Sequence, residues 1–281
     1  MSIQWFPGHM AKAKREVQEK LKLVDFVIEL VDARAPISST NPMLNDVLQQ
    51  KPKMQVLMKK DLADSSQTKK WISHLQSQGI KGIAVNVNDK SDIKSVVDLA
   101  KEMGAAKMEK LKKKGIRPRP ARAMIIGVPN VGKSTLINRL ANRKITKVGD
   151  KPGVTTAQQW IKIKKDFELL DTPGILWPKF EDEAVGYRLA ALGMIKDQLL
   201  TIEEIAMYVL DILKEHYPNL LVERYQLQSN DMSTVDLFEQ IGRLRGAIAS
   251  GNTIDQVKTA ELIIRDFRSG KIGPVTIEFP N

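Results

Sequence analysis

Residues 127–134 read Gly-Val-Pro-Asn-Val-Gly-Lys-Ser. This spacing is typical of a phosphate-binding loop, in which backbone amides surround phosphate oxygens. Lys133 is then expected to reach the β and γ phosphates, and the hydroxyl of Ser134 to ligate Mg²⁺. A strand pattern at 122–128 precedes the loop and a helical pattern at 133–142 follows it, as this kind of loop requires. The sequence therefore predicts a nucleotide site in which Lys133 takes part in catalysis.

Two later segments carry residues that suit a γ phosphate and its metal ion. Asp171, at the end of a strand pattern, begins an Asp-Thr-Pro-Gly sequence that ends at Gly174. The carboxylate is expected to hold Mg²⁺ through water, and the Gly174 amide to sense the γ phosphate. A Pro-Gly-Val-Thr-Thr segment lies between this motif and the phosphate loop. Either Thr155 or Thr156 suits the metal and the γ phosphate there, and spacing does not decide between them.

A fourth segment indicates which base is bound. Ras-like GTPases read guanine with an Asn-Lys-x-Asp sequence after a strand. Here the sequence is Met58-Lys59-Lys60-Asp61, so the lysine that packs along the base and the aspartate that accepts from guanine are present. Met58 replaces the asparagine, for which we expect weaker binding by about 1–3 kcal/mol. The next strand pattern ends near Asn86, where such proteins carry another base-contacting loop.

These segments together define the predicted nucleotide site. Its residues are Lys59, Lys60, Asp61, Asn86, Pro129, Asn130, Val131, Gly132, Lys133, Ser134, Thr135, Thr155, Thr156, Asp171 and Gly174. The expected Mg²⁺ ligands among them are Ser134, Thr155 and Asp171.

The elements that position these motifs alternate between strands and helices. Alternation of this kind predicts an α/β fold, with a mostly parallel sheet and helices on both faces. After residue 180 amphipathic helical patterns dominate, so we expect a GTPase domain over 1–180 and an all-α C-terminal domain over 181–281. The guanine motif precedes the phosphate loop, the reverse of the Ras-like order. The first domain is thus predicted to be a circularly permuted Ras-like P-loop GTPase domain.

The motifs closely resemble those of the ribosome biogenesis GTPase A family, which is a group of circularly permuted bacterial GTPases. The matches span nearly the whole chain and include residues 4–10, 31–34, 41–43, 127–134 and 170–182. The resemblance implies a GTP-hydrolysing assembly factor for the large (50S) ribosomal subunit. It also implies a C-terminal domain that contacts rRNA, and hydrolysis that acts as a release switch, stimulated by the ribosome.

The group that orients the attacking water is not obvious from the motifs. Ras-like enzymes use a glutamine directly after Asp-x-x-Gly, but Ile175 stands there and has no polar group. His9, in a Pro-Gly-His turn, is the candidate catalytic residue that the resemblance favours, and a purely structural histidine is the alternative. Similar GTPases with an asparagine at the place of Asn130 bind K⁺ through it, so the resemblance implies K⁺ beside GTP or GDP and Mg²⁺.

Charge and composition point to the same kind of partner. The 281 residues carry a formal net charge of +11, which favours a polyanion such as RNA. Residues 1–186 hold 34 basic and 20 acidic side chains, whereas 187–281 hold 10 and 13. We expect the RNA-facing surface to combine a basic helix at 10–22, the basic run 101–122 between the strand–helix units, and residues 243–271.

Several classes of protein are excluded or disfavoured. The chain has no cysteine, which rules out disulfides and thiol catalysis. It shows no apolar run long enough for a membrane span and no secretory signal, so we expect a cytoplasmic protein without a membrane partner. Nothing indicates a permanent homo-oligomer. Two alternatives stay open: a non-catalytic RNA-binding scaffold with a degenerate guanine-nucleotide site, and a P-loop ATPase.

Overall fold

A six-stranded sheet forms the centre of the protein. The computed structural model describes residues 15, 17–42, 48, 51–117, 119–145, 160–163, 165–172, 182–195, 200–229 and 231–280. The strands are β1 (Phe26–Asp32), β2 (Lys53–Met58), β3 (Lys81–Val85), β4 (Ala121–Gly127), β5 (Trp160–Ile163) and β6 (Phe167–Asp171). They lie in the order β3-β2-β1-β4-β6-β5.

The sheet confirms the predicted α/β class and its permuted order. All neighbouring strands pair in parallel except β5, which runs antiparallel to β6. The strand before the phosphate loop, β4, comes fourth in the chain but lies in the middle of the sheet between β1 and β6. The strand before the guanine motif, β2, lies on the other side of β1. Because these strands are parallel, the loops that follow them meet at one edge of the sheet.

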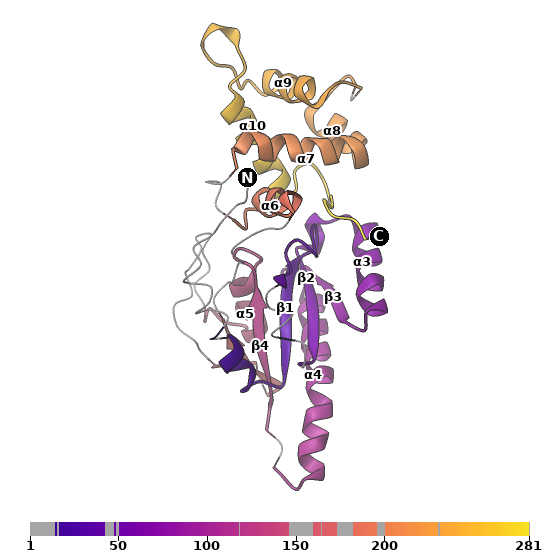
Figure 1. The fold of residues 1–281 in the computed structure, drawn as a ribbon, viewed down its shortest axis with the longest axis vertical. Coiled ribbons are helices and arrows are strands. Elements are labelled where there is room, and N and C mark those ends of the chain that lie inside the picture. The colour runs from indigo at the N-terminus through magenta and orange to yellow at the C-terminus, as the bar shows by residue number, and fades with distance from the viewer. Residues whose placement is uncertain are drawn as a thin grey trace.

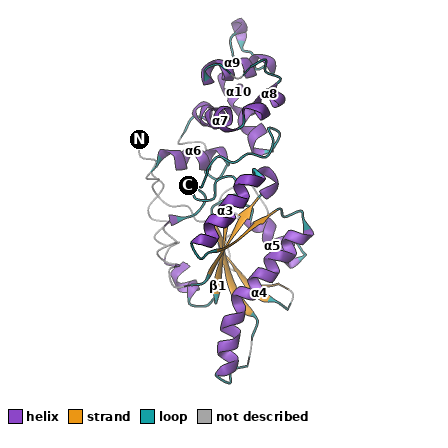
Figure 2. Ribbon diagram, turned by 90° about the vertical axis from the view of Figure 1, so that its right-hand side faces the viewer, coloured by secondary structure: helices purple, strands orange, loops and turns teal. Residues whose placement is uncertain are grey.

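Side chains of the central strands alternate between two apolar layers. In β1, Phe26, Ile28 and Leu30 belong to the larger core, whereas Val27 and Val31 belong to smaller clusters on the opposite face. The larger core includes residues of α4 (Lys90–Lys113) and α5 (Lys133–Ala141), and one of the smaller clusters includes residues of α3 (Ser65–Ser77). Figure 2 shows these helices on the two faces of the sheet, as predicted.

Helices dominate after residue 182. They are α6 (Glu183–Ala191), α7 (Ile202–His216), α8 (Pro218–Tyr225), α9 (Thr234–Leu244) and α10 (Gln256–Arg268). Thr201 and Glu204 form a capping box that begins α7, and such a box satisfies amide groups that the first turn leaves unpaired. The sequence pattern missed α8, a separate short helix that begins at Pro218 after a break at Tyr217. Proline suits the first turn of a helix because it lacks the amide hydrogen.

The helices after residue 182 and the sheet share one apolar core. The largest cluster of buried side chains runs from β1 and β4 into α7 and α10 without a break. Figure 1 shows α7–α10 at one end of an elongated molecule and the end of α4 at the other. Within the residues that the structure describes, no helix is both long and apolar enough to cross a bilayer.

Gly104 allows α4 to approach the sheet closely. A Cβ at this position would lie 2.4 Å from the Cβ of Ala121 in β4, well inside normal contact. We predict that Gly104→Val lowers the free energy of unfolding by about 1–3 kcal/mol or more, because an overpacked interior forces helix and strand apart. Denaturant unfolding measures the change. Ser95→Ala, on the exposed side of the same helix, is the control and should stay within about 0.5 kcal/mol; an equal loss in both variants would contradict the close approach.

Candidate functional site

The phosphate loop joins the end of β4 to the start of α5. Its backbone is left-handed at Asn130 (φ 59°) and at Gly132 (φ 104°), so the chain turns sharply before Lys133. A Cβ at Gly127 would lie 3.1 Å from the carbonyl oxygen of Leu30, which explains why glycine begins the loop. Ser134 and Thr135 follow in the first turn of α5, half-buried.

Lys133 and Asp171 meet at the mouth of this loop. The lysine Nζ donates to Oδ1 of Asp171 at 2.6 Å, and the two side chains are only 7% and 2% exposed. The next residue, Thr172, is anchored to β4 by a hydrogen bond from its hydroxyl to the carbonyl of Ile125 at 2.7 Å. The structure thus brings together the two charged groups that the sequence assigned to the phosphates and to the metal. This ion pair is suited to a nucleotide with Mg²⁺. The lysine can exchange the carboxylate for a negatively charged phosphate, and the carboxylate can exchange the lysine for the positively charged metal ion.

The guanine motif lies directly beside the phosphate loop. Lys59 has a left-handed backbone (φ 59°), and its Nζ lies 3.3 Å from the carbonyl oxygen of Asn130, to which it donates. Met58 is 1% exposed, and its Cε lies 3.2 Å from where a Cβ of Gly132 would be. Asp61 is exposed in the short helical turn Lys60–Leu62. The motif therefore supports the loop with a hydrogen bond and an apolar contact, and leaves the Asp61 carboxylate accessible.

Asp92 connects the loop after β3 with the guanine motif through hydrogen bonds to both. One carboxylate oxygen accepts from Lys60 Nζ at 2.6 Å, and the other accepts from the backbone amide of Asn86 at 2.7 Å. The Asn86 side chain in turn accepts from the amide of Asn88 at 2.9 Å. Lys60 and Asn86, which the sequence placed at one site, are thus neighbours held by a residue of α4 that the sequence analysis did not single out.

Asp32, at the end of β1, is the buried ionic centre of this edge of the sheet. It is fully buried and accepts from Arg34 Nε at 2.9 Å and from Arg34 Nη2 at 2.9 Å. Lys59 Nζ lies 3.0 Å from its Oδ2. Burial alone favours the neutral carboxyl, but the adjacent Arg34 and Lys59 cations override it and hold the pKa of Asp32 well below its usual range. The carboxylate therefore stays charged and fixes the guanine-motif lysine.

Residues near the end of the chain contact the segment that follows Asp61. The amide of Val275 donates to the carbonyl of Leu62 at 3.0 Å. The amide of Thr276 donates to the Tyr217 hydroxyl at 3.1 Å, and that hydroxyl donates to Asp64 at 3.2 Å. Burial and the nearby Asp64 carboxylate raise the pKa of Tyr217 to about 12, against the opposing hydrogen bond from Thr276. The phenol therefore remains a donor at neutral pH.

Glu278 makes a second connection between the end of the chain and the loop after β1. It is 6% exposed and accepts from the amides of Ile37 at 2.6 Å and Ser38 at 3.0 Å. Arg188 Nη1 of α6 donates to it at 3.1 Å. The sequence pattern at 274–279 indicated only an extended segment. It contained no signal for these contacts, because Ile37 and Ser38 lie about 240 residues away along the chain and Arg188 lies 90 residues away.

Asn130 connects the phosphate loop to the helices after residue 182. Its side-chain amide donates to the carbonyl of Gly193 at 2.8 Å. Gly193 lies two residues after the end of α6, and Arg268 of α10 donates to the nearby carbonyls of Ala190 and Ala191 at 2.7 and 3.0 Å. A shift in the phosphate loop is thus linked to α6 and α10 by a short chain of hydrogen bonds.

Some predicted residues lie outside the described part of the chain. They are His9, Thr155, Thr156, Gly174 and Ile175. Asp32 is a site residue that the sequence analysis did not assign, although the sequence contains a signal for it. It is an acidic residue at the end of a buried strand, and that strand pairs in parallel with the strand before the phosphate loop. The two strands therefore end at the same edge of the sheet. Within the described residues no group of three or more His, Cys, Asp or Glu side chains is placed to hold a metal.

The fold and these contacts define a class of protein. A mostly parallel sheet carries a phosphate loop after its central strand and an adjoining Lys-Lys-Asp motif after β2, in permuted order. A protein-family profile described as "50S ribosome-binding GTPase" matches residues 122–239. The protein is thus a P-loop GTPase.

Full-length relatives identify the family. Ribosome biogenesis GTPase A of Bacillus pumilus is 54% identical over 280 residues, which cover 100% of this chain and 99% of the relative. Mitochondrial ribosome-associated GTPase 1 of Bos taurus is 34% identical and aligns with 98% of this chain and 88% of its own. The GNP-bound structure of YlqF from T. maritima superposes with a TM-score of 0.66 at 28% identity, over 96% of this chain and 99% of that one. The chain belongs to the ribosome biogenesis GTPase A family.

The Asp32 centre yields a test of stability against pH. We predict that Asp32→Asn lowers the free energy of unfolding at pH 7 by about 3–5 kcal/mol, because Arg34 is left as a buried charge without its counter-ion. A carboxyl with a lowered pKa stabilises the fold above its unfolded pKa of about 3.9, and this contribution is lost as the pH falls toward the folded pKa. The gap between wild type and variant, measured by denaturant unfolding, should therefore narrow below about pH 4.

The matched control is Asp98→Asn, on the exposed side of α4, where the carboxylate is 57% exposed. This change should leave stability within about 0.5 kcal/mol at every pH. A gap between wild type and Asp32→Asn that is the same at all pH values would show that the ionised Asp32 carboxylate is not its source.

Proposed function

We propose that this GTPase is a cytoplasmic assembly factor that acts on the large ribosomal subunit, binds its rRNA and uses GTP hydrolysis as a release switch. The observation that carries the nucleotide half is the approach of Lys59 to the phosphate loop, 3.3 Å from the Asn130 carbonyl. This hydrogen bond places a motif suited to guanine next to a loop suited to phosphates, so that the two can bind one nucleotide. The names of the full-length relatives and the net charge of +11 support the ribosomal half.

Each charged residue of the site has a separate task in this proposal. Lys133 turns from Asp171 toward the β and γ phosphates, and Asp61 accepts from the guanine edge while Lys59 packs along the base. Ser134 and Asp171 hold Mg²⁺, with one of Thr155 and Thr156. When bound, Mg²⁺ neutralises charge that develops on the phosphate oxygens. A site with so few protein ligands suits Mg²⁺, which keeps waters and takes further ligands from phosphates.

Two groups complete the chemistry. His9 orients the attacking water, a task that Ile175 has no polar group to perform. Asn130 ligates K⁺, which supplies positive charge near the β and γ phosphates. The side-chain oxygen is the atom that would ligate the ion, because an amide nitrogen acts only as a donor, and the nitrogen of the same side chain donates to Gly193. Ligation would thus pull on the hydrogen bond that reaches α6, which gives hydrolysis a direct route to the helices after residue 182.

Base specificity tests the assignment of Asp61. We predict that Asp61→Asn weakens GTP binding about 10- to 100-fold, since a hydrogen bond to a charged group contributes about 1.5–3 kcal/mol. The amide should at the same time bind XTP better, because xanthine presents a carbonyl where guanine presents its exocyclic amine. Competition by unlabelled GTP, XTP and ATP measures both effects. Asp98→Asn is the control; a wild type displaced equally by ATP and GTP would favour a P-loop ATPase.

Hydrolysis in the presence of subunits tests the catalytic half. We predict that purified large ribosomal subunits stimulate GTP hydrolysis in KCl and that NaCl lowers the stimulated rate. His9→Ala should lower kcat by about 10²- to 10⁴-fold with little change in KM, as expected for loss of a group that acts only in the chemical step.

The matched control is His74→Ala, in α3, where the ring contacts Gln78 and Trp71. It should hydrolyse GTP at the wild-type rate. GTP binding without turnover, with or without subunits, would instead support the non-catalytic scaffold and contradict the release switch.

A further inference from the structure

The second half of α4 extends beyond the body of the protein. The helix has 24 residues, about 36 Å at 1.5 Å per residue. Its buried residues are Asp92, Val96, Ala100 and Gly104, and none follows Gly104. Figure 1 shows the helix continuing past the lower end of the sheet. Packing against the core therefore accounts for α4 only as far as Met108, which is partly buried against it, and we call residues 105–117 the arm.

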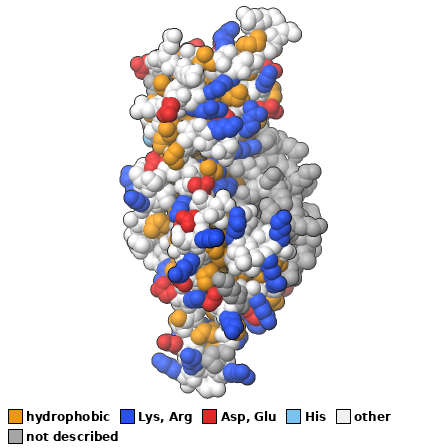
Figure 3. All heavy atoms as spheres, turned by 180° about the vertical axis from the view of Figure 1, so that it is seen from behind, with side chains coloured by type: hydrophobic (Ala, Val, Ile, Leu, Met, Phe, Trp, Pro, Cys, Tyr) orange, Lys and Arg blue, Asp and Glu red, His pale blue; other side chains and the backbone are white. Residues whose placement is uncertain are grey.

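Three lysines of the arm lie on one face of the helix. Lys107, Lys110 and Lys114 continue the helix face on which Ala100 and Gly104 are buried, by the three- and four-residue spacing of a helix. The acidic residues Asp98, Glu102 and Glu109 share the opposite side. The face that packs on the sheet over the first half of α4 is therefore positively charged over the second half. Figure 3 shows Lys and Arg side chains at this lower end of the molecule.

Stabilisation of the helix explains part of this pattern only. Lysines in a last turn interact favourably with the negative end of the helix dipole, by about 0.3–1 kcal/mol each. That accounts for Lys110, Lys112 and Lys113, which form the last turn. It does not account for Lys107 or for the extension of the helix past the sheet.

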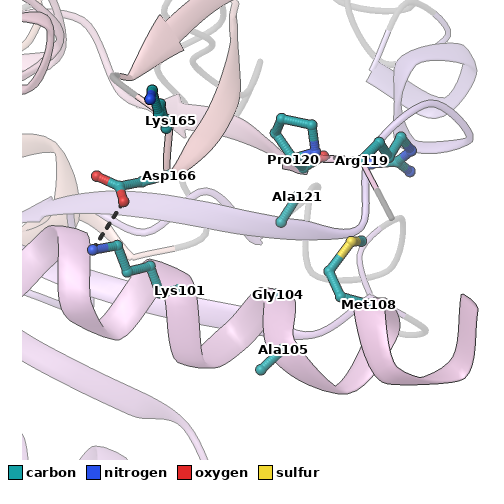
Figure 4. Close-up of a pocket in the computed structure, with 9 residues that line it drawn as sticks. All are labelled: Lys101, Gly104, Ala105, Met108, Arg119, Pro120, Ala121, Lys165 and Asp166. Carbon is teal, nitrogen blue, oxygen red and sulfur yellow. Dashed lines mark hydrogen bonds and ion pairs between the residues drawn. The ribbon is translucent and has the colours of Figure 1, made fainter. Parts of the chain in front are cut away.

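A pocket lies at the base of the arm. Its volume is about 340 Å³, and Gly104, Met108 and Pro120 line its apolar part. Lys101, Arg119 and Lys165 lie around it (Figure 4). Lys101 pairs with Asp166 at 2.9 Å and Arg119 with Asp25 at 2.8 Å, so their charges are largely cancelled. The net positive charge of this corner comes from Lys165 together with the lysines of the arm.

We propose that the corner between the arm and the β5–β6 turn is a docking site for an RNA backbone, with Lys107, Lys110 and Lys114 on phosphates. This inference rests on the proposed rRNA-binding function and assigns it a surface. Lysine is a phosphate-binding point charge, whereas protein–protein interfaces are depleted in lysine and enriched in aromatic residues and arginine. An exposed lysine face beside an open pocket therefore fits RNA better than it fits a protein.

Neutralising the arm tests the site quantitatively. We expect Lys107→Gln with Lys110→Gln to weaken binding of RNA extracted from purified large subunits by about tenfold at 0.1 M KCl. The slope of log affinity against log salt should fall by about two, one for each lost phosphate contact. Lys69→Gln with Lys70→Gln, two exposed lysines of α3, removes the same charge elsewhere. Equal affinities and slopes in the two double variants would overturn the site.

Cross-linking tests the location. Because the chain has no cysteine, Ala105→Cys places one photoreactive label at the pocket and Ser73→Cys places one on exposed α3. On whole large subunits we expect RNA cross-links from position 105 and none from 73. Cross-links from 105 to a ribosomal protein alone would overturn the RNA assignment. If the wild type bound no RNA, both the proposed rRNA binding and this site would be wrong. If the wild type bound RNA but the arm variants bound it equally well, only this site would be wrong.

GTP binding and unfolding serve as controls for both tests. The arm lysines are exposed and far from the nucleotide edge of the sheet in Figure 1, so each double variant should bind GTP as the wild type does and lose no more than about 1 kcal/mol of stability. A loss of RNA binding under those conditions then reports the surface itself.

Discussion

The nucleotide edge of this protein depends on one buried carboxylate. Asp32 ends a central strand, and its two oxygens face Arg34 and Lys59 at 2.9–3.0 Å. A fully buried charge is tolerated only when it is paired and hydrogen-bonded, and here both partners are needed. The pairing fixes Lys59 in a left-handed turn that a free lysine would not favour. Lys59 then reaches the phosphate loop, so the base and phosphate parts of the site share one anchor.

Circular permutation determines which segments of the chain support the ion pairs of Asp32. Here the guanine motif precedes the phosphate loop in the chain, and the segment after Asp171 leads to the helices. Those helices return to the guanine side. The ring of Phe267 in α10 lies 5.2 Å from the Arg34 guanidinium, and the amide of Ile277 donates to the Arg34 carbonyl at 2.9 Å. Movement of the helices would therefore displace Arg34 and change its ion pair with Asp32.

The accuracy of the sequence analysis follows from the range of the interactions involved. The strands, the phosphate loop and the permuted order were predictable, because apolar runs and glycine spacing are local. Lys60 and Asn86 lie close together, as expected for residues that follow neighbouring parallel strands. Asp92 and Glu278 were not found, because their roles depend on partners that only the folded chain brings close. The helix α8 was missed because its eight residues are too few for a clear helical repeat.

Met58 shows how the two parts of the site remain coupled despite an unusual residue. An asparagine at this buried position would bring a polar amide that needs hydrogen-bond partners. Met58 is buried, and its methyl group packs beneath Gly132. An unbranched thioether adapts to an irregular gap, and it leaves no buried amide that needs partners. Within the Met58–Asp61 motif, the hydrogen bond to the phosphate loop comes from Lys59, whose Nζ also pairs with Asp32. The ion pair at Asp32 thus helps to hold the motif against the loop.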